Sequence, residues 1–136
     1  MNKIEIKKIG LADIQQLQTL GKQTFIETFA DGNTEENMQL YLEEVFTVDK
    51  LTLELTDPNS DFYFASIGNK TIGYLKINVG QAQTELKDKK ALEIERIYVL
   101  KEFYGQQVGQ VLFDFAFELA KKAHAEILKG WLPWRP

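Results

Sequence analysis

The sequence contains no cysteine, three prolines and one histidine among 136 residues. Without cysteine the protein has no disulfide, no thiolate ligand for a metal and no cysteine nucleophile, and this composition fits a reducing compartment. We therefore expect a cytoplasmic protein. His124, the single histidine, follows the last helical segment, so we assign it no role and predict no metal site.

Long apolar runs and an excess of positive charge are also missing. No stretch approaches the roughly 18 apolar residues of a membrane span, and residues 1–10 have no signal-peptide core, so we expect no membrane partner. The net charge of -4 disfavours nucleic-acid binding, because phosphate neutralisation needs clustered Lys and Arg. Hydrophobic residues make up 44% of the chain, which is sufficient for the core of one globular domain.

The order of periodicities along the chain predicts an α+β domain. Four segments are rich in β-branched and aromatic residues: residues 4–9, 61–67, 71–79 and 91–99. Apolar residues at helical spacing mark four others: the segment after Gly10, those capped by Thr34 and Thr47, and the segment from Val108 to Ala123. Residues 125–128 look like the start of another strand. Short connections between the middle strands predict a mixed, mostly antiparallel sheet flanked by helices.

The loop YGQQVGQ, residues 104–110, joins the last long strand to the last helix. The first turn of a helix leaves backbone N–H groups without partners, and these donors attract phosphate. Gly105 and Gly109 lack a Cβ, so a bulky anion can approach the chain closely. The loop has neither the Gly-Lys-Ser/Thr ending of a P-loop nor three dinucleotide-type glycines. On these residues alone, a tight strand-to-helix turn is the favoured explanation of the pattern.

The same stretch resembles the coenzyme A-binding motif of the Gcn5-related N-acetyltransferase (GNAT) superfamily. In that motif a strand ending in L/I-Y-V is followed by Q/R-x-x-G-x-G/A at the start of a helix. Here residues 97–99 read I-Y-V and Gly109 matches the last glycine, whereas Tyr104 and Gln107 depart from the pattern. The resemblance covers residues 3–128, and residues 25–47 resemble the branch related to bacterial polyamine acetyltransferases.

The resemblance implies transfer of an acetyl group from acetyl-CoA to a primary amine, polyamine-like or on a peptide. It implies that the pantetheine arm lies along the end of the motif strand and that the diphosphate rests on the loop amides. The implied coenzyme-binding residues are Ile97, Tyr98, Val99, Tyr104, Gly105, Gln106, Gln107, Val108, Gly109 and Gln110.

Two carboxylates precede this motif. Glu93 and Glu95 are two residues apart and so point to one face of their strand. In the implied reaction either could accept the proton of the amine, directly or through water, if burial raises its pKa. The alternative is that both are solvated carboxylates on the polar side of an edge strand, with Arg96 opposite.

The family's fold continues beyond the last helix with a strand, a helix and two more strands. We therefore expect residues 1–128 to form an incomplete acetyl-CoA-binding domain, truncated in its C-terminal part, and residues 129–136 to form an atypical tail. Trp131 and Trp134 in this tail would be free to cover a sheet edge or to pack on another chain, which predicts a homo-oligomer. Three hypotheses remain: an active N-acetyltransferase, a catalytically impaired coenzyme-binding or oligomerising protein, and a structural domain.

Overall fold

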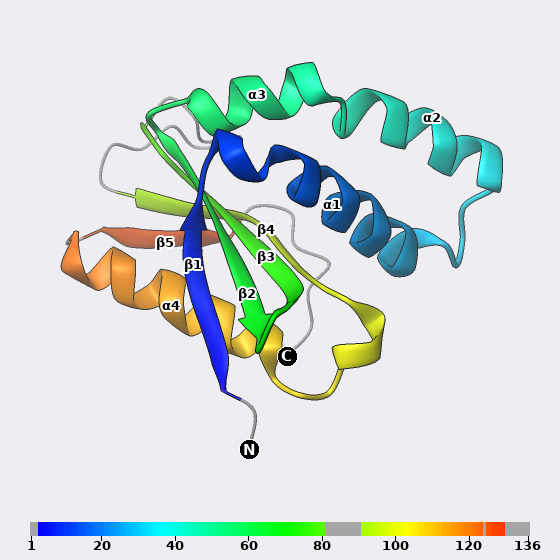
Figure 1. The fold of residues 1–136 in the computed structure, drawn as a ribbon. Coiled ribbons are helices and arrows are strands. Elements are labelled where there is room, and N and C mark those ends of the chain that lie inside the picture. The colour runs from blue at the N-terminus through cyan, green and yellow to red at the C-terminus, as the bar shows by residue number, and fades with distance from the viewer. Residues whose placement is uncertain (1–2, 81–90, 124, 130–136) are drawn as a thin grey trace.

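The computed structural model describes residues 3–80, 91–123 and 125–129 (Figure 1). In chain order its elements are β1 (Ile4–Ile9), α1 (Ile14–Phe29), α2 (Glu35–Val45), α3 (Val48–Thr56), β2 (Ser60–Ile67), β3 (Lys70–Val79), β4 (Ala91–Val99), α4 (Val108–Lys122) and β5 (Glu126–Lys129), with short 3-10 helices at Leu11–Asp13 and Lys101–Phe103. The predicted α+β fold class is confirmed. The predictions for the polar loop 81–90, His124, Trp131 and Trp134 lie outside the described residues.

The five strands form one sheet in the order β1-β2-β3-β4-β5. Neighbours from β1 to β4 are antiparallel, as the short connections predict, and β5 lies parallel to β4. A parallel neighbour needs a crossover connection, and α4 provides it between β4 and β5. As a result β4 lies between β3 and β5, with the loop 104–110 leaving from its end (Figure 1).

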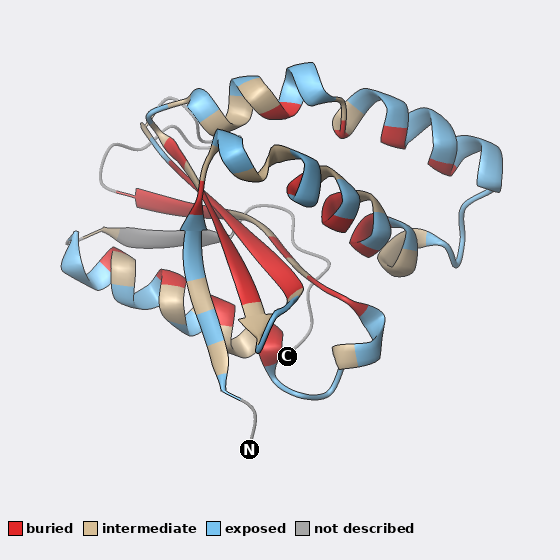
Figure 2. Ribbon diagram, in the orientation of Figure 1, coloured by how far each residue is buried: buried red, intermediate tan, exposed pale blue. Residues whose placement is uncertain are grey.

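Two apolar cores lie on opposite faces of the sheet, which makes the fold three-layered. Leu112 of α4 packs with Ile94 and Ile97 of β4 in one core. Leu17 of α1 and Phe62 of β2 belong to the other core, beneath α1, α2 and α3. The buried turns of the helices face the sheet in Figure 2, and the outer turns are exposed. Each layer is therefore positioned by the apolar stripe that the sequence shows.

Side-chain caps fix where two helices begin. The hydroxyls of Thr34 and Thr47 accept hydrogen bonds from the backbone N–H three residues on, at 3.1 Å and 3.2 Å. Both predicted caps are confirmed, and such a cap contributes about 1 kcal/mol. The helix expected after Gly10 starts instead as a 3-10 turn, in which Asp13 accepts from the Gly10 N–H at 3.2 Å.

β4 contains one residue more than β3 near its middle. Ile94 and Arg96 pair with consecutive residues of β3, and Glu95 lies between them as a β-bulge. The bulge shifts the alternation of side chains, so that Ile94 and Ile97 lie in the same core although they are three residues apart. It therefore decides which face the polar residues of β4 point to.

The antiparallel pairing of β3 with β4 leaves no room for a side chain at Gly73. A Cβ there would lie 2.7 Å from the backbone oxygen of Tyr98. We expect Gly73→Ala to lower the free energy of unfolding by about 2 kcal/mol in urea denaturation, since the backbone of β4 would have to move. A Cβ at Gly10 meets no atom within 4 Å, so Gly10→Ala is the control and should change stability by less than about 0.5 kcal/mol. Equal stability of the two variants would contradict this packing.

Candidate functional site

The end of β4 presents an unpaired strand edge. β5 pairs only with the first four residues of β4, Ala91–Ile94. From Glu95 to Val99, no described residue pairs with this side of β4, while β3 pairs with the other side. Such an edge can hydrogen-bond an extended ligand as an added strand would. Ile97, Tyr98 and Val99, the strand residues implied for coenzyme binding, all lie in this segment.

The loop that follows leaves backbone donors unused. Within the described residues, no acceptor bonds to the N–H groups of Gly105 and Gln107. Val108, Gly109 and Gln110 form the first turn of α4, whose N–H groups have no intrahelical acceptor and no capping side chain. These five donors form the kind of backbone site that binds phosphate.

Two of the implied loop residues use their N–H groups internally. Tyr104 donates to the oxygen of Lys101 at 3.0 Å, and Gln106 donates to the oxygen of Phe103 at 3.4 Å. The expectation that every amide of the loop is free is therefore too broad. The internal bonds hold the turn that presents the other amides.

Gln107 adopts a glycine-like backbone conformation. Its φ of 63° and ψ of 22° lie in the left-handed region, where it is the one non-glycine residue of the described chain. The motif of the resembling family has glycine at this position, so the loop keeps that backbone geometry although the residue differs. This conformation costs about 1–2 kcal/mol for a residue with a Cβ.

The start of the loop is fastened to α1. The backbone N–H of Lys101 donates to the carboxylate of Glu27 at 2.9 Å. Lys70 of β3 also forms an ion pair with Glu102 and lies 5.2 Å from the centre of the Phe103 ring. The loop therefore has fixed contacts with α1 and with the sheet.

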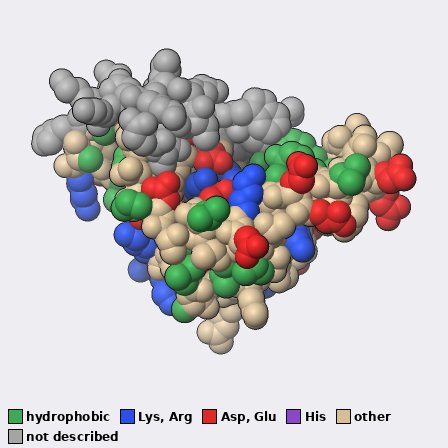
Figure 3. All heavy atoms as spheres, turned by 90° about the horizontal axis from the view of Figure 1, so that it is seen from above, with side chains coloured by type: hydrophobic (Ala, Val, Ile, Leu, Met, Phe, Trp, Pro, Cys, Tyr) green, Lys and Arg blue, Asp and Glu red, His purple; other side chains and the backbone are tan. Residues whose placement is uncertain are grey.

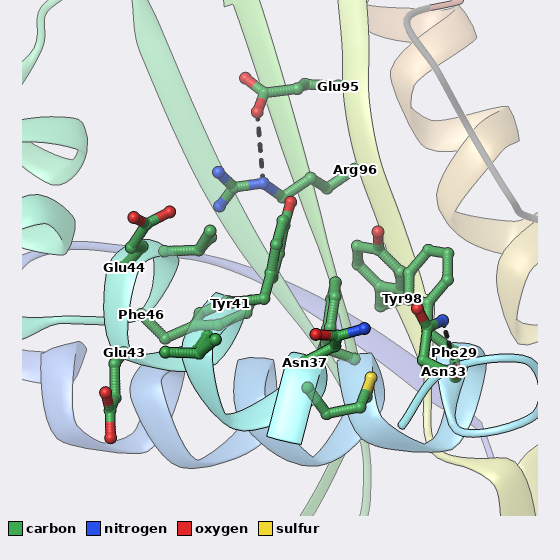
Figure 4. Close-up of a pocket in the computed structure, with 14 residues that line it drawn as sticks. Phe29, Asn33, Asn37, Tyr41, Glu43, Glu44, Phe46, Glu95, Arg96 and Tyr98 are labelled. Atoms are coloured by element: carbon green, nitrogen blue, oxygen red, sulfur yellow. Dashed lines mark hydrogen bonds and ion pairs between the residues drawn. The ribbon is translucent and has the colours of Figure 1, made fainter. Parts of the chain in front are cut away.

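A pocket of about 940 Å³ lies between α1, α2 and β4 (Figure 4). Its lining comprises Phe25, Phe29, Asn33, Asn37, Met38, Leu40, Tyr41, Glu43, Glu44, Val45, Phe46, Glu95, Arg96 and Tyr98. Tyr41 stacks on Phe25 with ring centroids 4.4 Å apart. Burial raises the pKa of Tyr98 to about 12, so this phenol remains protonated at neutral pH. The pocket therefore combines five aromatic side chains with polar and charged groups, and β4 contributes Glu95, Arg96 and Tyr98.

Glu95 belongs to a buried network of charges. It forms ion pairs with Lys76 at 2.8 Å and with Arg96 at 3.2 Å, and Arg96 makes a two-pronged contact with Glu54 of α3 at 3.1 Å and 3.3 Å. Burial alone would raise the pKa of Glu95, but Arg96 and Lys76 outweigh it and hold the pKa below its ordinary value. Glu95 is therefore ionised at neutral pH.

Glu93 lies beside Glu95 but deeper, with only 1% of its surface exposed. The side-chain amide of Asn78 donates to Glu93 at 2.8 Å and to Glu95 at 2.7 Å, so both carboxylates lie on one face of β4. Glu95 lines the pocket, whereas Glu93 is not one of the lining residues.

The alternative interpretation of these carboxylates is wrong in two respects. They are not solvated, because Glu93 is buried and the Glu95 side chain is 18% exposed. Arg96 does not lie opposite them, because the bulge turns it to the face of Glu95, where the two side chains bond to each other (Figure 4). A strand without a bulge would have placed Arg96 on the other face.

Acidic groups gather at the α2 end of the molecule. Figure 3 shows red carboxylates over that end, and the exposed acidic residues of α2 are Glu35, Glu36, Glu43 and Glu44. Two of them, Glu43 and Glu44, line the pocket. Tyr41 was expected in the apolar stripe of α2, yet it is 47% exposed and also lines the pocket. No local pattern in the sequence predicts that this helix supplies both an aromatic ring and carboxylates to a pocket.

Comparison with known proteins agrees with this geometry. The profile of the Acetyltransferase (GNAT) family matches residues 15–132. An uncharacterised N-acetyltransferase in the pepI 3′ region of Lactobacillus delbrueckii subsp. lactis is 36% identical over 132 residues, covering 97% of this chain and 75% of that protein. The spermidine N(1)-acetyltransferase of Thermoplasma acidophilum is 23% identical over 123 residues, covering 88% and 71%.

Solved structures share the fold. PaiA N-acetyltransferase from Thermoplasma acidophilum, in complex with coenzyme A, superposes with a TM-score of 0.74 at 22% identity, covering 88% of this chain and 73% of that one. An aminoglycoside acetyltransferase from an uncultured soil metagenomic sample, in complex with sisomicin, superposes with a TM-score of 0.68 at 18% identity, covering 94% of this chain and 77% of that one. In the described part of this chain, no helix is long and apolar enough to cross a membrane, and no three acidic or histidine side chains are placed to hold a metal.

The lowered pKa of Glu95 makes its contribution to stability dependent on pH. A carboxylate with a lowered folded pKa stabilises the fold above its unfolded pKa, and the contribution is lost as pH falls through the folded pKa. We expect Glu95→Gln to reduce urea stability at about pH 7 and to differ less from the parent protein below about pH 4. Glu36→Gln, an exposed change on α2, should show no such trend. A constant difference across this range would contradict the ionised state of Glu95.

Two loop variants separate backbone strain from ligand access. Gly105 has a φ of 82°, and a Cβ there meets no protein atom within 4 Å. Gly105→Ala should cost about 1 kcal/mol of stability, and if the loop binds phosphate it should weaken coenzyme A at least about fivefold, because the Cβ occupies the anion's approach. Gln107→Gly should instead raise the free energy of unfolding by about 0.5 kcal/mol and keep the parent affinity for coenzyme A. Calorimetric titration with coenzyme A measures both affinities, and equal values for the two variants would exclude the loop from coenzyme binding.

Proposed function

Because the chain belongs to the acetyltransferase (GNAT) family, we propose that it acetylates a polyamine-like primary amine, bound in the pocket between α1, α2 and β4. The chain is an N-acetyltransferase that uses acetyl-CoA as its cosubstrate, as the family and the 36% identical relative establish. The acceptor and the residues that carry the reaction are the proposed part. The observation that carries the proposal is a pocket that combines aromatic side chains, two exposed rim carboxylates (Glu43 and Glu44) and the partly buried Glu95.

The coenzyme lies, in this proposal, along the free edge of β4 and on the loop that follows. The edge from Glu95 to Val99 supplies backbone groups for an extended arm, and the free amides of residues 105 and 107–110 supply donors for the diphosphate. Support comes from the glycine-like conformation at Gln107, which keeps the loop open where the side chain differs from the family motif. Acetyl-CoA supplies an activated acetyl thioester beside the pocket.

The amine must lose a proton before it can attack an acyl group. We assign this proton to the Glu93–Glu95 pair, with Glu95 receiving it because Glu95 lines the pocket. A lowered pKa makes Glu95 a weak base, but aromatic walls such as Phe29 and Tyr98 disfavour a charged ammonium and so lower the pKa of the bound amine. The pocket thereby brings the pKa of the bound amine closer to the pKa of Glu95, which proton transfer between them requires.

The charge of the pocket favours an acceptor with more than one ammonium group. Glu43 and Glu44 lie on α2, away from Glu95 in Figure 4, so the pocket has separate acidic positions. Arg96, the cation among the lining residues, is already paired with Glu54. A peptide amine needs only one such position, so a polyamine fits the arrangement better.

The proposal predicts acceptor-dependent release of coenzyme A thiol. Spermidine and spermine should support faster thiol release from acetyl-CoA than a peptide with a free N-terminal amine, because they place a second ammonium near α2. Measurement of initial rates with a thiol reagent checks this. No thiol release with any of these amines would refute the function, and a faster peptide reaction would refute the polyamine-like acceptor.

We expect the rim carboxylates, Glu43 and Glu44, to contribute to binding of the acceptor amine. The double variant Glu43→Gln, Glu44→Gln should raise KM for spermidine about fivefold and leave kcat within about twofold, since exposed charge pairs contribute on the order of 1 kcal/mol. Glu36→Gln, an exposed change on the same helix at a residue that does not line the pocket, is the matched control and should keep the parent KM. An unchanged KM in the double variant would remove these residues from acceptor binding.

The homo-oligomeric state, the cytoplasmic location and the domain limits 1–128 and 129–136 stay predictions. An oligomer would be consistent with the free edge of β4 within the described residues. Sedimentation of the full chain tests the first of these, and a stable monomer would contradict it.

A further inference from the structure

We propose that Asn78 is a positioning residue of the acetyl-transfer reaction, which holds the Glu93 and Glu95 carboxylates together through one amide nitrogen. This inference rests on the proposed function in assigning the carboxylate pair to proton transfer. It goes beyond that function in naming the residue, on a different strand, that sets the geometry of the pair.

Asn78 lies within hydrogen-bond distance of both carboxylates. It pairs with Glu93 in the β3–β4 register, and the bulge residue Glu95 lies on the same side. Asn78 is completely buried and its Nδ2 lies 2.8 Å and 2.7 Å from the two carboxylate oxygens. An amide nitrogen carries two hydrogens, so each carboxylate receives one.

The orientation of the amide is fixed from the other end. The buried hydroxyl of Ser60 on β2 donates to Asn78 Oδ1 at 2.8 Å. An ionised carboxylate can only accept hydrogen bonds, so the nitrogen of Asn78 must face Glu93 and Glu95 and its oxygen must face Ser60. Side-chain hydrogen bonds thus connect β2, β3 and β4, from Ser60 through Asn78 to Glu95 at the pocket.

The amide has an electrostatic consequence as well as a geometric one. Two carboxylates that bond to one nitrogen lie close enough to repel each other when both are ionised. The hydrogen bonds that Asn78 donates to them oppose this repulsion. Other titratable groups face the pair from the packed elements: Lys76 and Tyr74 of β3, Arg96 and Tyr98 of β4, and Glu54 of α3. Of these groups, Lys76 and Arg96 form ion pairs with Glu95, whereas Asn78 joins Glu95 to Glu93.

The experiment replaces the donor without changing its shape. Asn78→Asp exchanges the amide for a third carboxylate of nearly the same volume. We expect the acidic limb of the kcat/KM profile to move up by about one pH unit or more, because a like charge replaces a donor. Asn69→Asp adds the same charge at the exposed turn between β2 and β3 and should leave the profile in place. Circular dichroism and thermal melting establish that each variant folds.

Ser60→Ala provides a second, milder test if Asn78→Asp fails to fold. It removes only the hydroxyl that orients the amide, so the acidic limb should move in the same direction by a smaller amount. KM for acetyl-CoA should be unchanged in both variants, since neither residue lies on the β4 edge or the loop. A folded variant with a lower melting temperature but an unmoved acidic limb would show a structural role only and would overturn the proposal.

A direct titration keeps this test separate from the proposed function. Carboxyl 13C NMR of protein labelled at glutamate, assigned with Glu93→Gln and Glu95→Gln, reports the midpoints of the pair without turnover. Raised midpoints in Asn78→Asp support the positioning role even if no amine is acetylated, in which case only the proposed function fails. Unchanged midpoints overturn the positioning role whether or not the parent protein is active.

Discussion

One extra residue in β4 sets the arrangement of charge on which the site depends. The bulge at Glu95 turns Arg96 to the pocket face, and Arg96 then bonds to both Glu95 and Glu54. Buried charges are costly unless they are paired, and this network pairs them. Without the bulge, Arg96 would have pointed into the core beneath α4, and Glu95 would have lost a contact that keeps it ionised.

The site joins two halves with different physical origins. The half proposed for the coenzyme consists of backbone groups: a strand edge that β5 leaves free and helix-start amides that no described residue uses. The half proposed for the acceptor consists of side chains from α1, α2 and β4 around the pocket. Backbone donors tolerate changes of side chain, which explains how Gln107 can stand where the family motif has glycine.

Much of the fold could be predicted from the sequence because its signals are local. Alternating apolar residues predicted the first and last residues of β1 and β4 correctly, and the hydroxyls of Thr34 and Thr47 indicated two helix starts. The loop that we propose for coenzyme binding could be identified as a candidate for the same reason, since its glycines and the strand before it are contiguous.

The acceptor half could not be predicted in this way. Asn78 meets Glu93 only through strand register, and Glu54 reaches Arg96 from a separate helix. Tyr41 fits the apolar periodicity of α2, yet α1 leaves its ring partly uncovered at the pocket. Long-range partners of this kind depend on how elements meet, which spacing along the chain does not record.

The parallel ladder between β4 and β5 has a consequence for the order of folding. Only Gly68 and Asn69 separate β2 from β3, whereas β5 can pair with β4 only after α4 has crossed the sheet, and its ladder has four residue pairs. Closing the β4–β5 connection costs more chain entropy than closing the β2–β3 hairpin, for fewer hydrogen bonds. We therefore expect the β5 ladder to form after the β2–β3 hairpin, and its amides to exchange with solvent hydrogen sooner than those of the central strands.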